Sequence, residues 1–378
     1  MSFQRAPPAL VIARIAELAE EDPTNRGATM LSRTNRECAW AARPAMMKNT
    51  TVYVGKASSP LAEVTTWMAA NTAYRALVRH LTISERGLTS EPRLYEDSDV
   101  TPTEILTLVN TFEDLRELTL NGLNITELGP LSLPAPMGPP SSTSLTITGS
   151  HADVTMHAVA SIATRLPRLT TLQVDGYGGE VMDTDLDVLK ATMEGSVLPL
   201  TALRVRRCTI DQVEAVNLIL RASAPTLAHL SIELWATPDP HYEIIGPARV
   251  DLTTLTRLGE LDIFIPLRVD YAWYDIVAHS LPVLHMVEYS PPTITTTHVV
   301  FWNRMDTVDE FLRALATFPI QSLCALLRRV PSMRKVYIRA GGSDVSTTMR
   351  ASRWQRVKRI SRGWRTALRK YERFLELI

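Results

Sequence analysis

The sequence predicts an α/β fold built as a solenoid, in which each repeat contributes a helix and a short parallel strand. Three observations support this prediction. A short apolar phrase, Leu-x-x-Leu-x-Val/Ile/Leu, recurs along the chain; prolines precede several of its copies; and apolar residues between the copies recur at helical spacing. Repetition at a period of a few tens of residues is typical of stacked structural repeats, which fold only as an array.

The recurring phrase predicts one strand per repeat. Its clearest copies span residues 115–120, 169–174, 200–205, 227–232 and 258–263, and weaker copies span 78–83, 284–289 and 333–338. From Leu118 through Leu145 to Val287, neighbouring copies are 26 to 31 residues apart, and a further, degraded repeat is expected near 298–302. Because strand side chains alternate between faces, the leucines should point into the stack and the residues between them outward.

Prolines mark where the predicted helices end. Four of them lie two residues before the first apolar position of a phrase: Pro167, Pro225, Pro282 and Pro331. Proline disfavours helical geometry in the residue before it, so each should end a helix just ahead of a strand. Apolar residues recur at helical spacing before two of these prolines, for example Val159 with Ile162 and Val216 with Ile219. This unit of helix, proline and strand resembles a leucine-rich repeat of the long type.

Composition and charge exclude several classes of protein. The 378 residues are 45% hydrophobic with a net charge of +0, so no overall field attracts nucleic acid or a membrane. Three distant cysteines, Cys38, Cys208 and Cys324, argue against a disulfide framework and a zinc site. The apolar run at 9–19 is interrupted by charges and is too short for a transmembrane segment. We therefore expect a cytoplasmic or nuclear protein without metal or cofactor.

No residue pattern typical of an enzyme appears. The chain has neither a Gly-x-Ser-x-Gly elbow nor a phosphate-binding glycine loop, and its eight histidines are scattered without a His-x-x-x-His motif. The acidic run at 183–187 followed by Glu194 resembles a calcium loop in outline. It lacks the glycine that such a loop needs, and an acidic helix start explains it better. We expect a non-enzymatic protein with no catalytic residues.

Residues 1–55 predict a small helical motif that differs from the repeats. One helix is opened by prolines near residue 7, and a second runs from about residue 30 to 44. The residues of this motif that resemble an F-box are Pro7, Pro8, Leu10, Val11, Ile15, Leu18, Leu31, Arg33 and Trp40. With leucine-rich repeats following it, the chain resembles fungal-type F-box/leucine-rich-repeat proteins.

That resemblance implies a substrate-recognition subunit of a Skp–cullin–F-box-type ubiquitin ligase. The F-box-like residues would bind the Skp-family adaptor, which bridges to a cullin–RING ligase, and the solenoid would hold a client protein. The alternative is a scaffold outside any ligase, whose N-terminal helices only cap the solenoid. A motif of under about fifty residues has too little core to be stable alone, so its apolar face must pack against either the repeats or a partner.

The solenoid is predicted over residues 56–345, and the outward strand positions form its candidate client-binding face. These positions carry both signs of charge, which suits protein recognition, although a solvated sheet surface would look the same. The client-binding candidates are Glu117, Thr119, Asn121, Gln173, Asp175, Arg204, Arg206, His229, Ser231, Glu233, Glu260 and Asp262.

Residues 346–378 predict a basic amphipathic helix. Apolar residues such as Trp354, Val357, Trp364 and Leu368 recur at steps of three and four, and Lys and Arg occupy much of the remainder. The helix could seal the last repeat with its apolar stripe. Alternatively, it could contact an acidic partner, nucleic acid or anionic lipid.

Overall fold

The computed structural model describes residues 46–54, 60–85, 99–125, 141–149, 156–176, 183–209, 212–235, 250–267, 291–303 and 335–341, with residues 316, 359 and 362. The chain divides into two compact units. The N-terminal unit is Met1–Thr148 with Arg165–Arg168, and the C-terminal unit is Gly149–Thr164 with Leu169–Ile378. Most of the predicted F-box-like motif and of the C-terminal helix lies outside the described residues, although residues 359 and 362 are helical.

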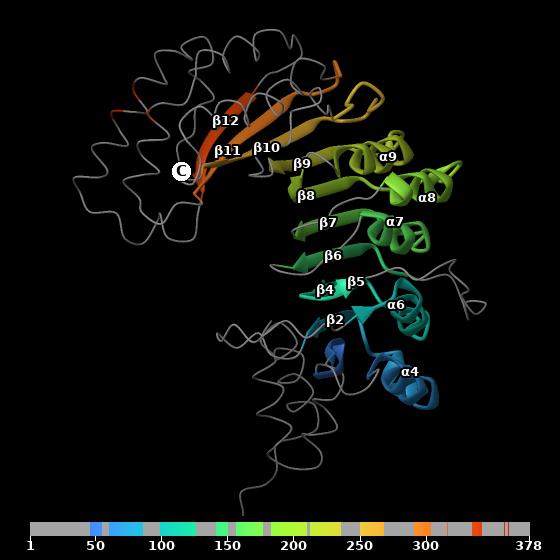
Figure 1. Cartoon of the computed structure of the whole chain (residues 1–378). Coiled ribbons are helices and arrows are strands. Elements are labelled where there is room, and N and C mark those ends of the chain that lie inside the picture. Colours follow the sequence, from blue (N-terminus) through green and yellow to red (C-terminus); the bar gives the residue numbers. More distant parts are fainter. Residues whose placement is uncertain are drawn as a thin grey trace, which may run out of the picture. The chain divides into compact units, whose positions relative to one another are not determined.

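The N-terminal unit contains a parallel sheet with helices on one side (Figure 1). Its strands follow the order β1 (Asn49–Val54), β2 (His80–Glu85), β4 (Glu117–Asn121) and β6 (Ser144–Gly149). Its helices are α4 (Pro60–Ala70), α5 (Thr72–Arg75) and α6 (Pro102–Val109). Strands β3 (Asp99–Val100) and β5 (Asn124–Ile125) form a separate parallel pair. The sequence predicted no strand at β1, which extends the sheet before residue 55.

A capping box defines the start of α6. The Thr101 side chain accepts a hydrogen bond from the backbone N–H of Glu104, and the Glu104 carboxylate accepts one from the backbone N–H of Thr101 at 3.0 Å. Pro102 follows at the first helical position, where its missing N–H costs nothing. This helix therefore begins where two otherwise unpaired backbone donors are satisfied.

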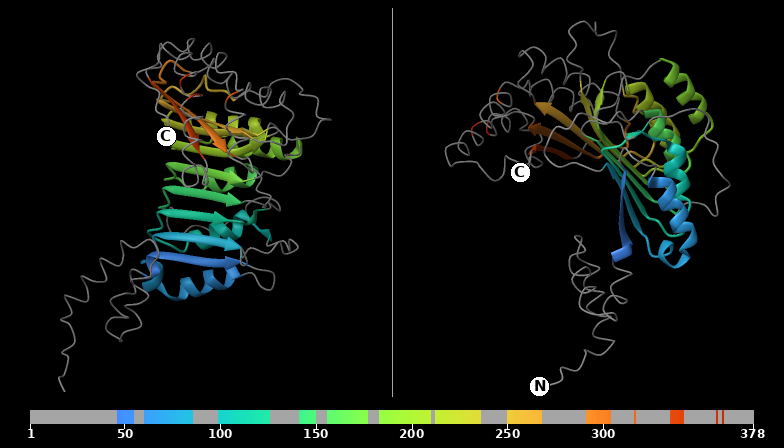
Figure 2. Two further views of the ribbon diagram at one scale, coloured as in Figure 1. Left: turned by 90° about the vertical axis from the view of Figure 1, so that its left-hand side faces the viewer. Right: turned by 60° about the horizontal axis from the view of Figure 1, so that its bottom comes forward.

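The C-terminal unit alternates helix and strand through its first half. The elements with described bounds are α7 (Met156–Thr164), β7 (Thr171–Gly176), α8 (Asp183–Met193), β8 (Ala202–Thr209), α9 (Val213–Ser223), β9 (His229–Trp235), β10 (Glu260–Leu267), β11 (Thr296–Asn303) and β12 (Lys335–Gly341). Strands β7 to β12 pair in chain order, and every pair is parallel (Figure 2). The predicted α/β class with a parallel sheet is thus confirmed.

Two of the four proline markers and the acidic helix start are also confirmed, and the other two markers, Pro282 and Pro331, lie outside the described residues. Helix α7 ends at Thr164, before Pro167, and α9 ends at Ser223, before Pro225. Helix α8 begins at Asp183 and continues through the segment that resembles a calcium loop in outline. No helix among the described residues is long and apolar enough to cross a membrane.

The leucines of the phrase form the core of both units. In the C-terminal unit, the second leucines of four strands pair side by side and are at most 1% exposed: Leu172, Leu203, Leu230 and Leu261. The N-terminal unit repeats this with Leu81, Leu118 and Leu145. Helices α7, α8 and α9 all lie on one side of their strands, and they bury residues such as Val159, Leu189 and Ile219 (Figure 1). The predicted alternation of inward and outward positions is therefore correct within each unit.

The predicted strand register is wrong after β10. Strand β10 pairs directly with β11, and β11 pairs directly with β12, so residues 284–289 do not supply the strand between β10 and β12. Residues 284–289 themselves lie outside the described residues. The place of the second leucine in β11 is taken by Thr297, which is fully buried. A polar residue at a core position explains why this repeat looked degraded in the sequence.

Candidate functional site

The outward positions of the C-terminal unit align across neighbouring strands. One row of paired residues runs from β7 to β11, through Gln173, Arg204, Ser231, Asp262 and His298. A second row, on β9 and β10, pairs His229 with Glu260. On the far side of the first row, Asp175 pairs with Arg206 on β7 and β8, and Glu233 pairs with Phe264 on β9 and β10. The structure thus brings nine predicted client-binding residues to one sheet face, opposite the side that carries α7, α8 and α9.

The three remaining client-binding candidates lie on β4 in the N-terminal unit. Thr119 is paired with Thr146 of β6, and Glu117 lies beside His80, with Glu117 Oε1 3.8 Å from His80 Nε2. The Asn121 side chain donates to Ser84 Oγ at 3.2 Å and accepts a hydrogen bond from Thr148 Oγ1 at 3.0 Å. Cross-strand hydrogen bonds therefore hold part of this outward surface in place.

Two of the client-binding candidates are buried. Ser231 is 3% exposed and Glu233 is 1% exposed, so these two candidates are not accessible at the outward face. The physical reason is the size of their neighbours. The guanidinium carbons of Arg204 and Arg206 lie 5.8 and 4.5 Å from the ring centroid of Phe264, which is itself 7% exposed.

A β-bulge contributes to this arrangement. Strand β8 pairs regularly with β9 up to Val205, and pairing resumes at Cys208 opposite Leu234, which leaves two residues of β8 opposite Glu233. A bulge re-aims side chains and increases local twist, and here it accompanies the close approach of Arg206 to Phe264. A guanidinium over an aromatic ring is stabilised by the quadrupole of the ring, so the two arginines cover this part of the face.

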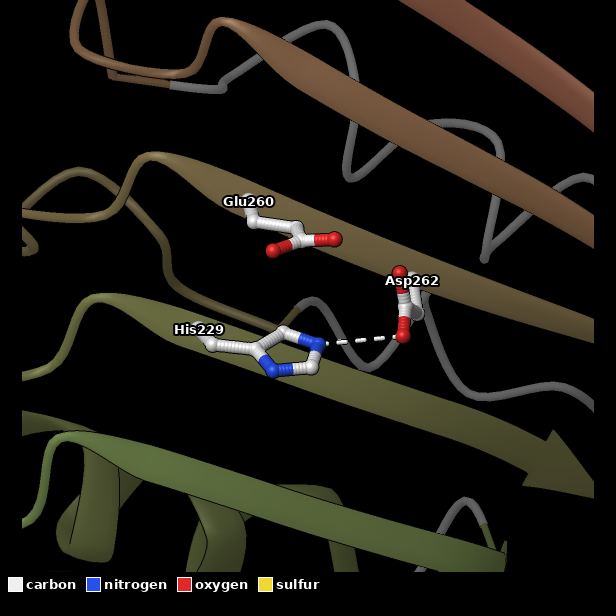
Figure 3. A group of neighbouring side chains, drawn as sticks. All are labelled: His229, Glu260 and Asp262. Atoms are coloured by element: carbon white, nitrogen blue, oxygen red, sulfur yellow. Dashed lines mark hydrogen bonds and ion pairs between the residues drawn. The ribbon is translucent and has the colours of Figure 1, made fainter.

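Four side chains form what we call the His–carboxylate cluster, defined as His229, Glu260, Asp262 and His298. His229 Nε2 lies 3.0 Å from Asp262 Oδ2, and His298 Nδ1 lies 2.5 Å from Asp262 Oδ1. His298 Nδ1 is also 3.2 Å from Glu260 Oε1. Figure 3 shows the Asp262 carboxylate facing the His229 ring, with the Glu260 carboxylate alongside. Asp262 therefore bridges two imidazoles from the two flanking strands.

Electrostatics in the cluster favour ion pairing. Burial alone would raise the pKa of Asp262, but hydrogen bonds from His229 and His298 outweigh it and lower that pKa to about 2. The hydrogen bond to Asp262 raises the pKa of His229, although burial opposes this change. The cluster thus holds a carboxylate that stays ionised and at least one imidazole that takes up a proton more readily than usual.

The sequence analysis identified three members of this cluster and missed His298. That residue lies opposite Asp262 because β11 is the direct neighbour of β10, whereas the phrase pattern placed the next strand at 284–289. The signal that could have found it is the degraded repeat expected near 298–302.

The predicted adaptor-binding residues all lie outside the described residues. They are Pro7, Pro8, Leu10, Val11, Ile15, Leu18, Leu31, Arg33 and Trp40. Their assignment rests on the resemblance of the sequence to an F-box.

No protein-family model matches the sequence, and no curated protein has significant sequence similarity to it. Among solved structures, the chain is similar to the leucine-rich repeat-containing protein LegL7 from Legionella pneumophila. That similarity has a TM-score of 0.32 at 11% sequence identity, and it covers 84% of this chain and 97% of LegL7.

Proposed function

We propose that this protein is a non-enzymatic scaffold of the leucine-rich-repeat type that binds a client protein. In this proposal the helix–strand units stack as a solenoid, and the client contacts the outward face of β7 to β11. The observation that carries the proposal is the in-register alternation of the strands, which buries the leucine rows and leaves a polar row on the other face. A parallel sheet in most α/β proteins is covered by helices on both faces, so a polar face on which no helix of the described residues lies favours a binding surface.

The chemistry of this face suits a protein partner. It combines arginines, carboxylates, imidazoles and an aromatic ring, and Arg and aromatic residues are enriched in protein interfaces. Gln173, Asp175, Arg204 and Arg206 are each partly exposed, so they remain accessible to a partner. The stacking of Arg204 and Arg206 on Phe264 fixes these long side chains in advance, which lowers the entropy lost on binding.

Charge-reversing substitutions should show whether the client binds the sheet face or the helix side. The full chain is used to capture partners, each candidate is purified, and its affinity is measured by calorimetry. We expect Arg204→Glu to weaken binding by roughly tenfold or more, as for an interface arginine near the centre of a contact. The matched control is Lys190→Glu on α8, on the opposite side of the sheet, which should leave the affinity unchanged. A client lost with Lys190→Glu but retained with Arg204→Glu would refute the assignment of the sheet face.

The finer proposal is that the scaffold is the substrate-recognition subunit of a Skp–cullin–F-box-type ubiquitin ligase, working in the cytoplasm or nucleus. It is supported by the F-box-like residues that precede the repeats in the sequence. The alternative function is a scaffold outside any ligase, whose N-terminal helices only cap the repeats. The two proposals differ in one partner, the Skp-family adaptor.

Adaptor binding distinguishes the two. In a pull-down with a purified Skp-family adaptor, we expect the full chain to bind and the Leu10→Asp/Ile15→Asp variant to lose binding, because charges would enter an apolar contact. The expected loss is on the order of a hundredfold in affinity, from two buried apolar side chains. If the wild-type chain leaves the adaptor unbound while still capturing its client, the ligase proposal fails and the scaffold proposal stands.

A further inference from the structure

We propose that the His–carboxylate cluster binds one zinc ion. The site would sit on the outward face of the C-terminal unit, with ligands from β9, β10 and β11. It goes beyond client binding, because the proposal concerns an inorganic ligand held by this chain alone.

Strand register explains why four donor groups converge. Glu260 and Asp262 are two residues apart on β10, so both project to the same face. His229 pairs with Glu260 from one side, and His298 pairs with Asp262 from the other. Each histidine therefore reaches across to β10 from a strand about 4.8 Å away, the usual spacing of paired strands.

The donor atoms of the cluster already lie near one another. One donor atom from each of His229, Glu260 and Asp262 lies within 4.8 Å of the other two. His298 Nδ1 adds a fourth donor, 2.5 Å from Asp262 Oδ1 and 3.2 Å from Glu260 Oε1. Zinc–nitrogen and zinc–oxygen bonds of about 2.0–2.2 Å place tetrahedral ligands about 3.4 Å apart. In this proposal the side chains rotate to bring the donors to that separation, and the ion replaces the hydrogen-bond protons that now link the groups (Figure 3).

The mixture of donors favours zinc over other common cations. Calcium and magnesium prefer oxygen donors throughout, whereas two imidazole nitrogens with two carboxylate oxygens suit zinc. Two negative carboxylates also balance the charge of a divalent ion. The cluster thus supplies the number, type and charge of ligands that a zinc site needs.

The exposure of the four side chains suits entry and retention of an ion. Asp262 and His298 are 18% and 14% exposed, so the inner half of the site is fixed within the sheet. His229 and Glu260 are 39% and 44% exposed, so the outer half is open to solvent. The backbone positions are set by paired strands on both sides of β10, which keeps the ligands close together without metal.

This site has no local sequence motif. Its ligands come from three strands separated by long connections, so the sequence around them shows neither His-x-x-x-His spacing nor a cysteine pair. The expectation that the chain binds no metal was based on the absence of those local motifs.

Zinc binding can be measured directly on the full, untagged chain. After treatment with a chelator and its removal, we expect calorimetric titration with zinc chloride to give one site per chain. Cobalt(II) should give the visible absorption of a tetrahedral site, and excess zinc should remove it. We expect His229→Asn, His298→Gln and Glu260→Gln each to weaken zinc binding by roughly tenfold or more.

The matched control is His80→Asn on β2, a histidine that also lies beside a carboxylate but has no second histidine near it among the described residues. It should leave the affinity and the cobalt spectrum unchanged. Glu260→Gln separates loss of a zinc ligand from misfolding, because this variant keeps both hydrogen bonds between Asp262 and the histidines. Absence of zinc binding by the folded wild-type chain, or equal binding by a folded His229→Asn/His298→Gln variant, would overturn the proposal.

Discussion

Replacing Leu172 with alanine should lower the free energy of unfolding by about 2–5 kcal/mol, the range for truncating a buried leucine. Leu172 is fully buried and pairs with Leu203 on the neighbouring strand, so its loss leaves a cavity in the leucine row. Urea unfolding of the full chain, followed by circular dichroism, measures the effect.

The adjacent residue supplies the control. Gln173 is the next residue of β7 and projects to the opposite, polar face, so Gln173→Ala should change the unfolding free energy by about 0.5 kcal/mol or less. Similar losses in the two variants would mean that the two faces of the strand are equally buried. That result would contradict the alternation on which the whole fold assignment depends.

The second large effect should come from Asp262. Because hydrogen bonds from two histidines lower its pKa to about 2, the ionised carboxylate stabilises the folded chain. A shift from 3.8 to about 2 corresponds to about 2 kcal/mol, and the side chain is 18% exposed, so screening by solvent is limited. We expect Asp262→Asn to lower the unfolding free energy by about this amount near pH 5, measured in chelator.

The difference in unfolding free energy between wild type and Asp262→Asn should decrease at both low and high pH. The carboxylate contribution is present above about pH 4 and is lost as the pH falls towards 2. The His229 contribution is complete below pH 6.5 and is lost as the pH rises through its raised pKa in the folded chain. The stability difference should therefore be largest between about pH 4 and 6.5. The control is Asp187→Asn, which removes an exposed carboxylate. A difference in unfolding free energy for Asp262→Asn that does not change with pH would refute the account.

The core of the fold could be predicted because most repeats carry a leucine at the same position of the strand. Leu118, Leu172 and Leu230 recur at a nearly fixed spacing, so their burial and the strand around each follow from the pattern. The prolines after α7 and α9 act through the backbone of their immediate neighbours, which a sequence reveals directly. Local rules and repetition were therefore sufficient for the α/β class and for the alternation of faces.

Features that depend on contacts between distant residues could not be predicted in the same way. The strand beside β10 was predicted at 284–289, whereas β11 takes that place, and Thr297 at its core position made this repeat look degraded. His298 was therefore missed. Glu233 was expected at the surface, yet it is buried where β8 bulges and Arg206 approaches Phe264. Neither the bulge nor the stacking has a signature in the neighbouring sequence, since each depends on which strand lies beside which.

Photo-crosslinking of the client tests the central claim most directly. A benzoylphenylalanine residue is introduced at Gln173 on the outward face of β7, or at Val188, which is 50% exposed on α8. If the client binds the outward sheet face, irradiation should crosslink it to the chain carrying the probe at position 173 and leave it free with the probe at 188. Crosslinking from position 188 alone would place the client on the helix side and contradict the account.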